Sequence, residues 1–356
     1  MRVPIITNKL RNILMIFSGF IVFFVFFTNV ENVKKSVLEA LIICFENFIP
    51  TIFPFMIISL FFLYLSGFSA HNLGVASRIF DILGICKRYV FHIFIGSLCG
   101  FVTGAKAICE DYAENDVEKE DFSNSVILSS NAGIGFVVGF IGVKLWGSFY
   151  YGIFLFAVQI IVALILNMLI LRHSKGEEKF DSSASEKTVF DSLTTAISTS
   201  GFSIITICAF VVFFSTLINV TASFFGISKS SPLFSFIFIL IEFCQGSVYA
   251  VSYDAILVCA FFTGFVIGFG GICVHFQIFS VCSGFPLKKM QFFTFKLLQG
   301  IICGIISLGY VYIANLEPMR DVFLRESTIY THFIAVPFSL LVLPLLCKKI
   351  FSKKKF

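Results

Sequence analysis

The chain has 356 residues, of which 58% are hydrophobic and only 13% are charged, and its mean hydropathy is +0.96. Soluble domains average about 25% charged residues, so this composition excludes a soluble globular domain and indicates an all-α polytopic membrane protein. The formal net charge of +5 is small. Its basic residues gather at the two ends of the chain, and basic residues beside a span are more typical of a cytoplasmic terminus than of nucleic-acid binding.

The cysteine pattern argues against a disulfide framework and against a metal centre. None of the 11 cysteines forms a CxxC pair, and none is spaced with the five histidines as zinc ligands are. Most lie inside apolar runs, where cysteine behaves as a small hydrophobic residue. We expect no metal, no cofactor and no enzymatic activity, because HExxH, GxSxG and P-loop signatures are also missing from the sequence.

A transmembrane helix needs about 20 apolar residues, and the sequence predicts about ten transmembrane or re-entrant segments. The first follows a basic start but lacks a small-x-small cleavage site, so we expect a retained span rather than a signal peptide. Residues 68–88 are too polar to span, and their apolar spacing predicts a helix in the membrane interface. The predicted segments are 12–30, 37–66, 90–108, 122–143, 148–171, 190–220, 232–250, 255–282, 292–314 and 329–347.

The basic residues predict that both termini are cytoplasmic. Ten crossings would place 15 Lys and Arg residues inside and ten outside, with Lys296 within a span, an excess in the direction of the positive-inside rule. In this topology Arg88 and Lys288 lie inside, whereas the acidic loop 110–121 lies outside. Lys296, five residues into its segment, is expected to extend its ammonium group to the inner interface.

A polar linker divides the chain into two halves with a similar order of segments. Each half has a long span, a span that ends in a glycine-rich polar break, a second broken span and an intact span. Transporters are commonly built from such pseudo-repeats. The repeats would be parallel if each half crosses four times, and they could be inverted if a broken segment is re-entrant. The predicted regions are an N-terminal span and loop (1–36), a first repeat (37–171), the linker (172–191), a second repeat (192–314) and a C-terminal span with a basic tail (315–356).

Four breaks interrupt the predicted spans with glycine and polar residues. Glycine costs about 1 kcal/mol relative to alanine in a helix interior. Unwound backbone at membrane depth is tolerated only where it is buried in protein or lines a wet cavity. Close helix packing is the alternative explanation for such glycines, for example at Gly139 and Gly142 or at Gly300 and Gly304. The breaks read "GSLCGFVTGAK" at 96–106, "LSSNAGIG" at 128–135, "EFCQGS" at 242–247 and "GFGGICVHFQ" at 268–277.

We predict that the four breaks surround one anion-binding cavity. A helix that begins at mid-depth leaves its first four N–H groups unpaired and carries roughly half a positive charge at that end. Replacing Asn131 by Leu is therefore expected to block transport. The predicted binding residues are Thr103, Gly104, Lys106, Ser129, Ser130, Asn131, Gly133, Glu242, Gln245, Gly246, Gly270, Gly271, His275 and Gln277.

Three of these residues are ionisable, and each has two interpretations. Glu242 is the candidate for substrate binding or proton coupling, because an intramembrane charge is costly and marks a functional site by default. His275 is alternatively a hydrogen-bonded core residue. Lys106 is a cation for a second carboxylate, or it extends to the outer interface.

The ordered motifs resemble the YlbJ-type sporulation integral membrane proteins of the wider nucleoside-recognition (Gate) superfamily. The resemblance rests on the four breaks together with "FIPTIFPFMIISLF" at 48–61 and "DSLTTAISTSGFSIITICAFVVFFS" at 191–215, and it runs from about residue 40 to 312. The family's first break usually reads Ser-Gly-Tyr-Pro-x-Gly-Ala-Lys. Its Asn-Pro after the second break is replaced here by Gly-Ile-Gly, which leaves room for a changed substrate or partner. In this sequence Cys99, Gly100, Phe101 and Val102 stand where the family pattern has Ser-Gly-Tyr-Pro.

The resemblance implies a role in spore formation, in which dipicolinate moves from the mother cell to the forespore. The expected protein is a multi-pass transporter of a small polar anion in the cell membrane, specifically the outer forespore membrane. Membrane lipid is the other expected partner, nucleic acid is not one, and no oligomeric state is indicated. A non-transporting scaffold or assembly factor of the spore envelope is the alternative.

Overall fold

The computed structural model describes residues 5–66, 80, 82–115, 117–171 and 188–319. The predicted span 329–347, most of the predicted interfacial helix and most of the predicted linker lie outside the described residues. Within the described ranges the chain is helical and has no strand, which confirms the predicted all-α class.

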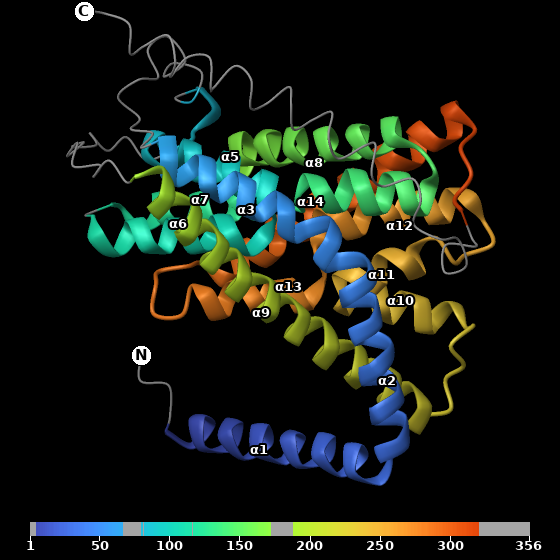
Figure 1. The fold of residues 1–356 in the computed structure, drawn as a ribbon. Coiled ribbons are helices and arrows are strands. Elements are labelled where there is room, and N and C mark those ends of the chain that lie inside the picture. The colour runs from blue at the N-terminus through green and yellow to red at the C-terminus, as the bar shows by residue number, and fades with distance from the viewer. Residues whose placement is uncertain (1–4, 67–79, 81, 116, 172–187, 320–356) are drawn as a thin grey trace, which may run out of the picture. The chain divides into compact units, whose positions relative to one another are not determined.

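The first half consists of helices that are repeatedly interrupted (Figure 1). α2, η1 and α3 follow one another directly, and η1 and η4 are π-helices, a form found mostly as short bulges and often at functional sites. The elements are α1 (Ile5–Thr28), α2 (Val30–Ile43), η1 (Cys44–Phe48), α3 (Ile49–Ser66), the 3₁₀ turn η3 (Lys87–Tyr89), α5 (Val90–Cys99), α6 (Phe101–Glu114), α7 (Lys119–Ser129), η4 (Gly135–Leu145) and α8 (Phe149–Ile170).

The second half also contains both long helices and short, interrupted ones. α9 begins at Val189, two residues before the predicted end of the linker at residue 191. The elements are α9 (Val189–Phe224), α10 (Pro232–Ile241), α11 (Phe243–Ala250), α12 (Ile256–Phe269), α13 (Gly271–Val281) and α14 (Lys289–Ala314).

Five helical stretches in the described residues are long and apolar enough to cross a membrane, which supports the prediction of a multi-pass membrane protein. They include α8, α9 and α14, and two stretches that run through more than one element. A helix of 26 residues, such as α14, is about 39 Å long and can therefore cross a hydrocarbon core about 30 Å thick. The two composite stretches are Val30–Phe62 and Ile256–Val281.

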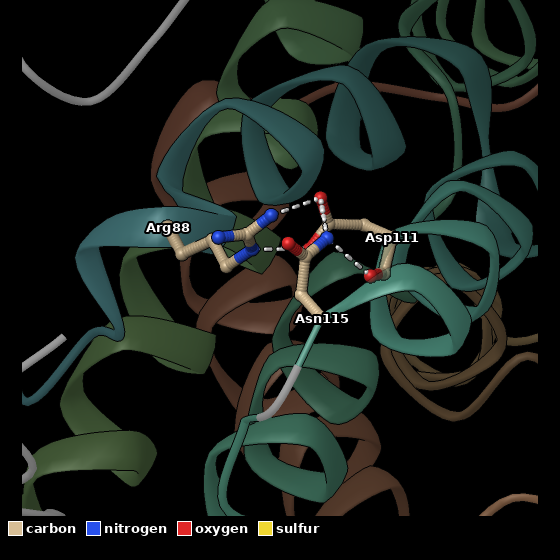
Figure 2. A network of polar contacts seen from close by, with 3 residues as sticks. All are labelled: Arg88, Asp111 and Asn115. Carbon is tan, nitrogen blue, oxygen red and sulfur yellow. Dashed lines mark hydrogen bonds and ion pairs between the residues drawn. The ribbon is translucent and has the colours of Figure 1, made fainter. Parts of the chain in front are cut away.

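The segment predicted as span 90–108 is instead one arm and part of the second arm of a helical hairpin. α5 and α6 run antiparallel from Gly100, and a Cβ on Gly104 would lie only 2.6 Å from the Cα of Gly96 in the other arm. At the open end, Arg88 makes a two-point ion pair with Asp111 at 2.5 and 2.9 Å (Figure 2). The arms of 10 and 14 residues are about 15 and 21 Å long, which is shorter than the hydrocarbon core of about 30 Å. Because the arms are antiparallel, the start of α5 and the end of α6 lie on the same side of the molecule.

The segment predicted as span 232–250 is a second hairpin, built from α10 and α11. Its tip is Glu242, the residue between the two helices. Near the open end the rings of Tyr249 and Phe234 have centroids 5.3 Å apart, and the Tyr253 hydroxyl donates to the Pro232 carbonyl oxygen at 3.1 Å. The chain therefore returns to the side from which it entered.

Polar contacts between connections correct the predicted topology. Lys288 lies 2.6 Å from Glu120, so the connection between α6 and α7 is beside the connection between α13 and α14. We call this side face A; it also holds the Arg88–Asp111 ion pair. The ten-crossing topology had placed loop 110–121 opposite Arg88 and Lys288, which these two ion pairs contradict.

The other side, face B, is the side of the connection 251–255. The composite stretch Ile256–Val281 separates this connection from face A by about 39 Å of helix. The hairpin of α5 and α6 thus opens toward face A, and the hairpin of α10 and α11 opens toward face B. Both reach inward from opposite sides.

α12 and α14 lie side by side (Figure 1), and small residues let them approach closely. A Cβ on Gly300 would lie 2.9 Å from the Phe269 Cβ, and one on Gly304 would lie 2.8 Å from the Phe261 carbonyl oxygen. Close packing is therefore the role of these two glycines, as it is for Gly142 against α8. Gly139, for which packing was the alternative, has no neighbour within 4 Å of a Cβ position.

Candidate functional site

Each of the four predicted breaks is a helix boundary in the structure. Gly100 separates α5 from α6, residues 130–133 lie between α7 and η4, Glu242 separates α10 from α11, and Gly270 separates α12 from α13. Gly100, Gly270 and Gly271 have φ angles of 111°, 79° and 72°, which residues with a Cβ rarely adopt. These glycines therefore form the boundaries between helices, and their role is not limited to close helix packing.

The four breaks touch one another. A Cβ on Gly133, in the second break, would lie 2.9 Å from the Cys99 carbonyl carbon in the first. A Cβ on Gly271, in the fourth, would lie 3.2 Å from the Phe243 nitrogen in the third. The rings of Phe101 and Phe243, the first residues of α6 and α11, have centroids 5.1 Å apart in an edge-to-face arrangement. The tips of the two hairpins thus meet.

A cavity of about 50 Å³ lies where the breaks meet. Residues of all four breaks line it, together with Ile52 and Phe55 of α3 and Ile207 and Val211 of α9. By this measure a water molecule needs roughly 10–15 Å³, so the cavity has room for a few waters. Glu242 is the one charged side chain on its wall among the described residues.

Four predicted binding residues, one from each break, line this cavity: Thr103, Gly133, Glu242 and Gln277. The other ten are not on its wall, which narrows the predicted site. Several of them stabilise the breaks themselves; the hydroxyls of Ser129 and Ser130, for example, donate to a carbonyl oxygen of α7. The ten are Gly104, Lys106, Ser129, Ser130, Asn131, Gln245, Gly246, Gly270, Gly271 and His275.

Glu242 caps α11 with its own carboxylate. The side chain is fully buried, and its two oxygens accept the N–H groups of Cys244 at 3.0 Å and Gln245 at 2.5 Å. The carboxyl group lies at the positive end of the helix, where an oxygen acceptor is stabilised. The start of α11 is therefore already occupied by a side chain of the protein.

The starts of α6 and η4 differ from that of α11, because their N-cap residues, Gly100 and Ile134, make no side-chain cap bond. Their first residues, Phe101 and Gly135, both line the cavity. Uncapped N–H groups and the helix dipole make such starts suited to an anionic or strongly polar group. The last carbonyls of α5 lie at the same place, since Leu98 and Cys99 also line the wall.

Asn131 lies behind the cavity wall, in a buried network that links the second break to α8 and α14. Its Oδ1 accepts from Lys296 Nζ at 3.2 Å and from Gln299 Nε2 at 3.0 Å, and Lys296 also donates to Gln299 Oε1 at 2.9 Å. The Gln159 side chain pairs with both backbone groups of Ala132, at 2.8 and 3.2 Å. The unwound backbone thus obtains its hydrogen bonds from side chains, as buried backbone requires.

Lys296 does not extend to the interface, which corrects the expectation from the sequence. It is 1% exposed, and within the described part of the chain no carboxylate forms an ion pair with it. Its ammonium group is held by two amide oxygens. Because Asn131 supplies one of them, replacing Asn131 by Leu would disturb this network and would not test substrate binding alone.

His275 fits the hydrogen-bonded core interpretation. Its Nδ1 lies 2.7 Å from the Gly271 carbonyl oxygen, and its ring packs between Phe269 at 4.9 Å and Phe292 at 5.1 Å. The side chain is 3% exposed and is not on the cavity wall. Lys106 is half-buried on α6.

The sequence prediction missed the residues that connect the breaks. Gln159 and Gln299 were not singled out, although each is an amide within an apolar segment, where a polar side chain is costly and needs a partner. The aromatic residues Phe101, Phe136 and Phe243 were also missed. They gave no usable signal, because the chain has 50 phenylalanines.

Comparison with protein-family models, with curated proteins and with solved structures found no match. The functional interpretation therefore rests on the geometry of the site. That geometry offers a small enclosed space with uncapped helix starts, helix-end carbonyls, one buried carboxylate and aromatic rings, a set that suits a small polar solute.

Proposed function

We propose that this protein is a membrane transporter that moves a small polar anion through the cavity between the two hairpin tips. The observation that carries the proposal is the arrangement of the hairpins. They enter from opposite faces, and their first tip residues, Phe101 and Phe243, meet at a cavity that all four breaks line. Discontinuous helices around a central site are the construction that secondary transporters use.

The chemistry of the wall supports an anion as the solute. The uncapped starts of α6 and η4 supply N–H donors and the positive ends of helix dipoles. Thr103 adds a hydroxyl, and Gln277 adds an amide. In the resemblance to the sporulation proteins the anion is dipicolinate, moved into the forespore across its outer membrane.

The hairpins also support inverted repeats as part of the proposal. Because neither hairpin crosses, α3, α7–η4 and α8 make three crossings in the first half, and α9, α12–α13 and α14 make three in the second. An odd number per half inverts the second half relative to the first, which is the symmetry that lets one site alternate between two faces. In the proposed cycle each hairpin closes the path to the face from which it enters.

The proposal requires the cavity to enlarge when solute binds. A space of about 50 Å³ is well below the roughly 300–1,000 Å³ of typical ligand sites. The edge-to-face contact of Phe101 with Phe243, together with Phe136 at 4.6 Å from Phe243, closes the space. We therefore assign the described conformation to an occluded state.

The test is uptake of radiolabelled dipicolinate by vesicles that contain the purified protein. Uptake above that of protein-free vesicles is expected, and Thr103→Val should lower it about tenfold, because a hydrogen bond to a charged group contributes about 1.5–3 kcal/mol. Thr206→Val is the matched control, since Thr206 is exposed on α9 and bonds only within its helix. Uptake equal to that of empty vesicles would reject dipicolinate transport.

One observation favours the alternative of a non-transporting scaffold. The one charged side chain on the cavity wall, Glu242, is an acid whose oxygens are used to cap α11. A scaffold requires no solute, so its cavity can stay closed. The alternative predicts that Thr103→Val leaves the protein's cellular role intact, and that cross-linking the hairpin tips through cysteines at Phe101 and Phe243 does no harm.

A further inference from the structure

A second hollow in the structure shares no residue with the central cavity. It is an apolar groove between α1, α2, η1 and α9, with a volume of about 610 Å³. We call it the α2–α9 groove. Its wall includes Phe26, Val37, Phe45, Ile204 and Phe213.

The groove runs along the helices for about the depth of one lipid leaflet. On α9 its lining extends from Ile204 to Thr216, which is about 18 Å of helix, and half of a bilayer's hydrocarbon core is about 15 Å. Asn32, near the start of α2, donates to Ser223, near the end of α9, at 3.1 Å. The two helices are therefore antiparallel here, and Thr216 lies nearer to the start of α2 than Ile204 does.

The polarity of the groove changes along this direction. At the end of the groove that is nearer to Ser223, Thr216 is 2% exposed, and its Oγ1 has no hydrogen-bond partner among the described residues. Toward Ile204 the lining is apolar apart from thiols. A hydroxyl that needs a partner at one end, followed by a long apolar wall, matches the ester region and acyl chain of a phospholipid.

A basic residue stands at the same end. Lys34 is exposed, and within the described ranges it has no ion pair. At 100° per residue, Lys34 lies about 60° around α2 from the groove residue Val37, whereas Lys35 lies about 160° away. Of the two acids of α2, Glu39 is paired with Lys229 at 3.0 Å, and Glu31 forms no ion pair within the described ranges. Lys34 thus remains available to a phosphate.

We propose that the α2–α9 groove binds one acyl chain of an anionic phospholipid, with the lipid phosphate at Lys34, an ester oxygen at Thr216 and the chain extending toward Ile204. This inference is independent of what the central cavity transports. It assigns a lipid class to one site, which goes beyond general contact with the bilayer.

The test uses tryptophan fluorescence and lipids brominated on their acyl chains, which quench tryptophan on contact. Trp146 is the single tryptophan and is buried, so each reporter is read as a difference from the parent. Phe213→Trp places the reporter in the groove. Ile165→Trp, on the lipid-facing side of α8, is the matched control, because both parent side chains are 50% exposed.

In phosphatidylcholine vesicles, brominated phosphatidylglycerol should half-quench the Phe213→Trp reporter at about one fifth of the concentration that brominated phosphatidylcholine requires, since one lysine near the surface attracts an anionic lipid about fivefold. Lys34→Glu should abolish this preference, while Lys35→Glu should keep it. The Ile165→Trp reporter should show no preference. Equal quenching by the two lipids at Phe213→Trp would overturn the proposal. So would an equal loss with Lys34→Glu and Lys35→Glu, or a groove that no lipid quenches because protein fills it.

Discussion

Lys296 shows how a cation can be kept inside the membrane without a carboxylate. Its ammonium group is held by the amide oxygens of Asn131 and Gln299. Each amide is itself oriented by further bonds; Gln299 Nε2, for instance, also donates to the Gln159 carbonyl oxygen at 2.9 Å. The lysine therefore depends on neutral partners whose positions are fixed by three different helices or breaks.

This dependence predicts an unequal effect of two substitutions. Gln299→Leu should lower the free energy of unfolding by about 1.5–3 kcal/mol, because it removes one of the two hydrogen bonds of the buried ammonium. The double variant Lys296→Met, Gln299→Leu should be more stable than Gln299→Leu alone, since no charge is then buried. Denaturant unfolding of the detergent-purified proteins measures both values. Additive losses in the double variant would show that the two residues are not coupled.

The position of Lys296 could not be predicted from the sequence. Its place five residues into an apolar segment is typical of lysines that reach the interface, and local pattern contains nothing else. One of the two residues that hold it, Asn131, is 165 positions away. Glu242 was more predictable, because a carboxylate directly before Phe-Cys-Gln-Gly has the spacing of a residue that caps the following helix.

At the scale of elements, the hairpin of α5 and α6 depends on two glycines that face each other. A Cβ on Gly104 would lie 2.6 Å from Gly96 Cα and 2.8 Å from Ser129 Cβ, so it would have to move either the other arm or α7. Neither neighbour is the flexible end of a side chain. The contact therefore sets how closely the hairpin closes and how it lies on α7.

We expect Gly104→Ala to lower the melting temperature, even though alanine favours helix by about 1 kcal/mol, because overpacking a close contact costs about 1–3 kcal/mol. Gly139→Ala is the matched control. It is also a glycine in a helical stretch, but nothing lies within 4 Å of its Cβ position. A thermal melt of each purified variant measures the effect. Equal melting temperatures for the two variants would contradict the tight contact.

The breaks were predictable, but their topology was not. A run of glycine, serine and asparagine in an apolar segment is a local signal of a helix end, and it located all four. Whether the chain then continues or folds back depends on contacts between its two arms, such as Gly96 with Gly104. One clue to the hairpin was available in the sequence. Arg88 and Asp111, which can form an ion pair, lie on either side of the predicted span 90–108, 23 residues apart. An ion pair between them requires the chain to fold back.

At the scale of the whole molecule, treating both hairpins as non-crossing changes the charge balance across the membrane. With α1, α2–α3, α7–η4, α8, α9, α12–α13 and α14 as crossings, the chain up to residue 319 begins on face A and ends on face B. This topology predicts that the 19 Lys and Arg residues of 1–319 divide into 13 on face A, four on face B, and Lys106 and Lys296 within helices. The four are Lys34, Lys35, Lys144 and Lys229.

This balance is more uneven than the ten and eight that the ten-crossing topology gives for the same residues, and the positive-inside rule therefore predicts that face A is cytoplasmic. The rule was not used to define the hairpins, which follow from ring contacts, hydrogen bonds and ion pairs. In the two-hairpin topology the acidic loop 110–121 lies on face A, the side predicted to be cytoplasmic. This agrees with the positive-inside rule, because acidic residues contribute little to orientation.

Epitope insertions test this topology at positions where the two arrangements disagree. An epitope in the connection 115–118 should be protected from an external antibody in intact cells and accessible in inverted vesicles, because α6 and α7 meet on face A. An epitope in the connection 226–230 should show the opposite pattern, because α9 ends on face B. The ten-crossing topology predicts the reverse at both positions. An epitope in the connection 282–288 is the control, since both arrangements place it in the cytoplasm. If 115–118 is reached from outside while 282–288 is protected, the Lys288–Glu120 ion pair cannot form in the membrane, and the two-hairpin architecture is wrong.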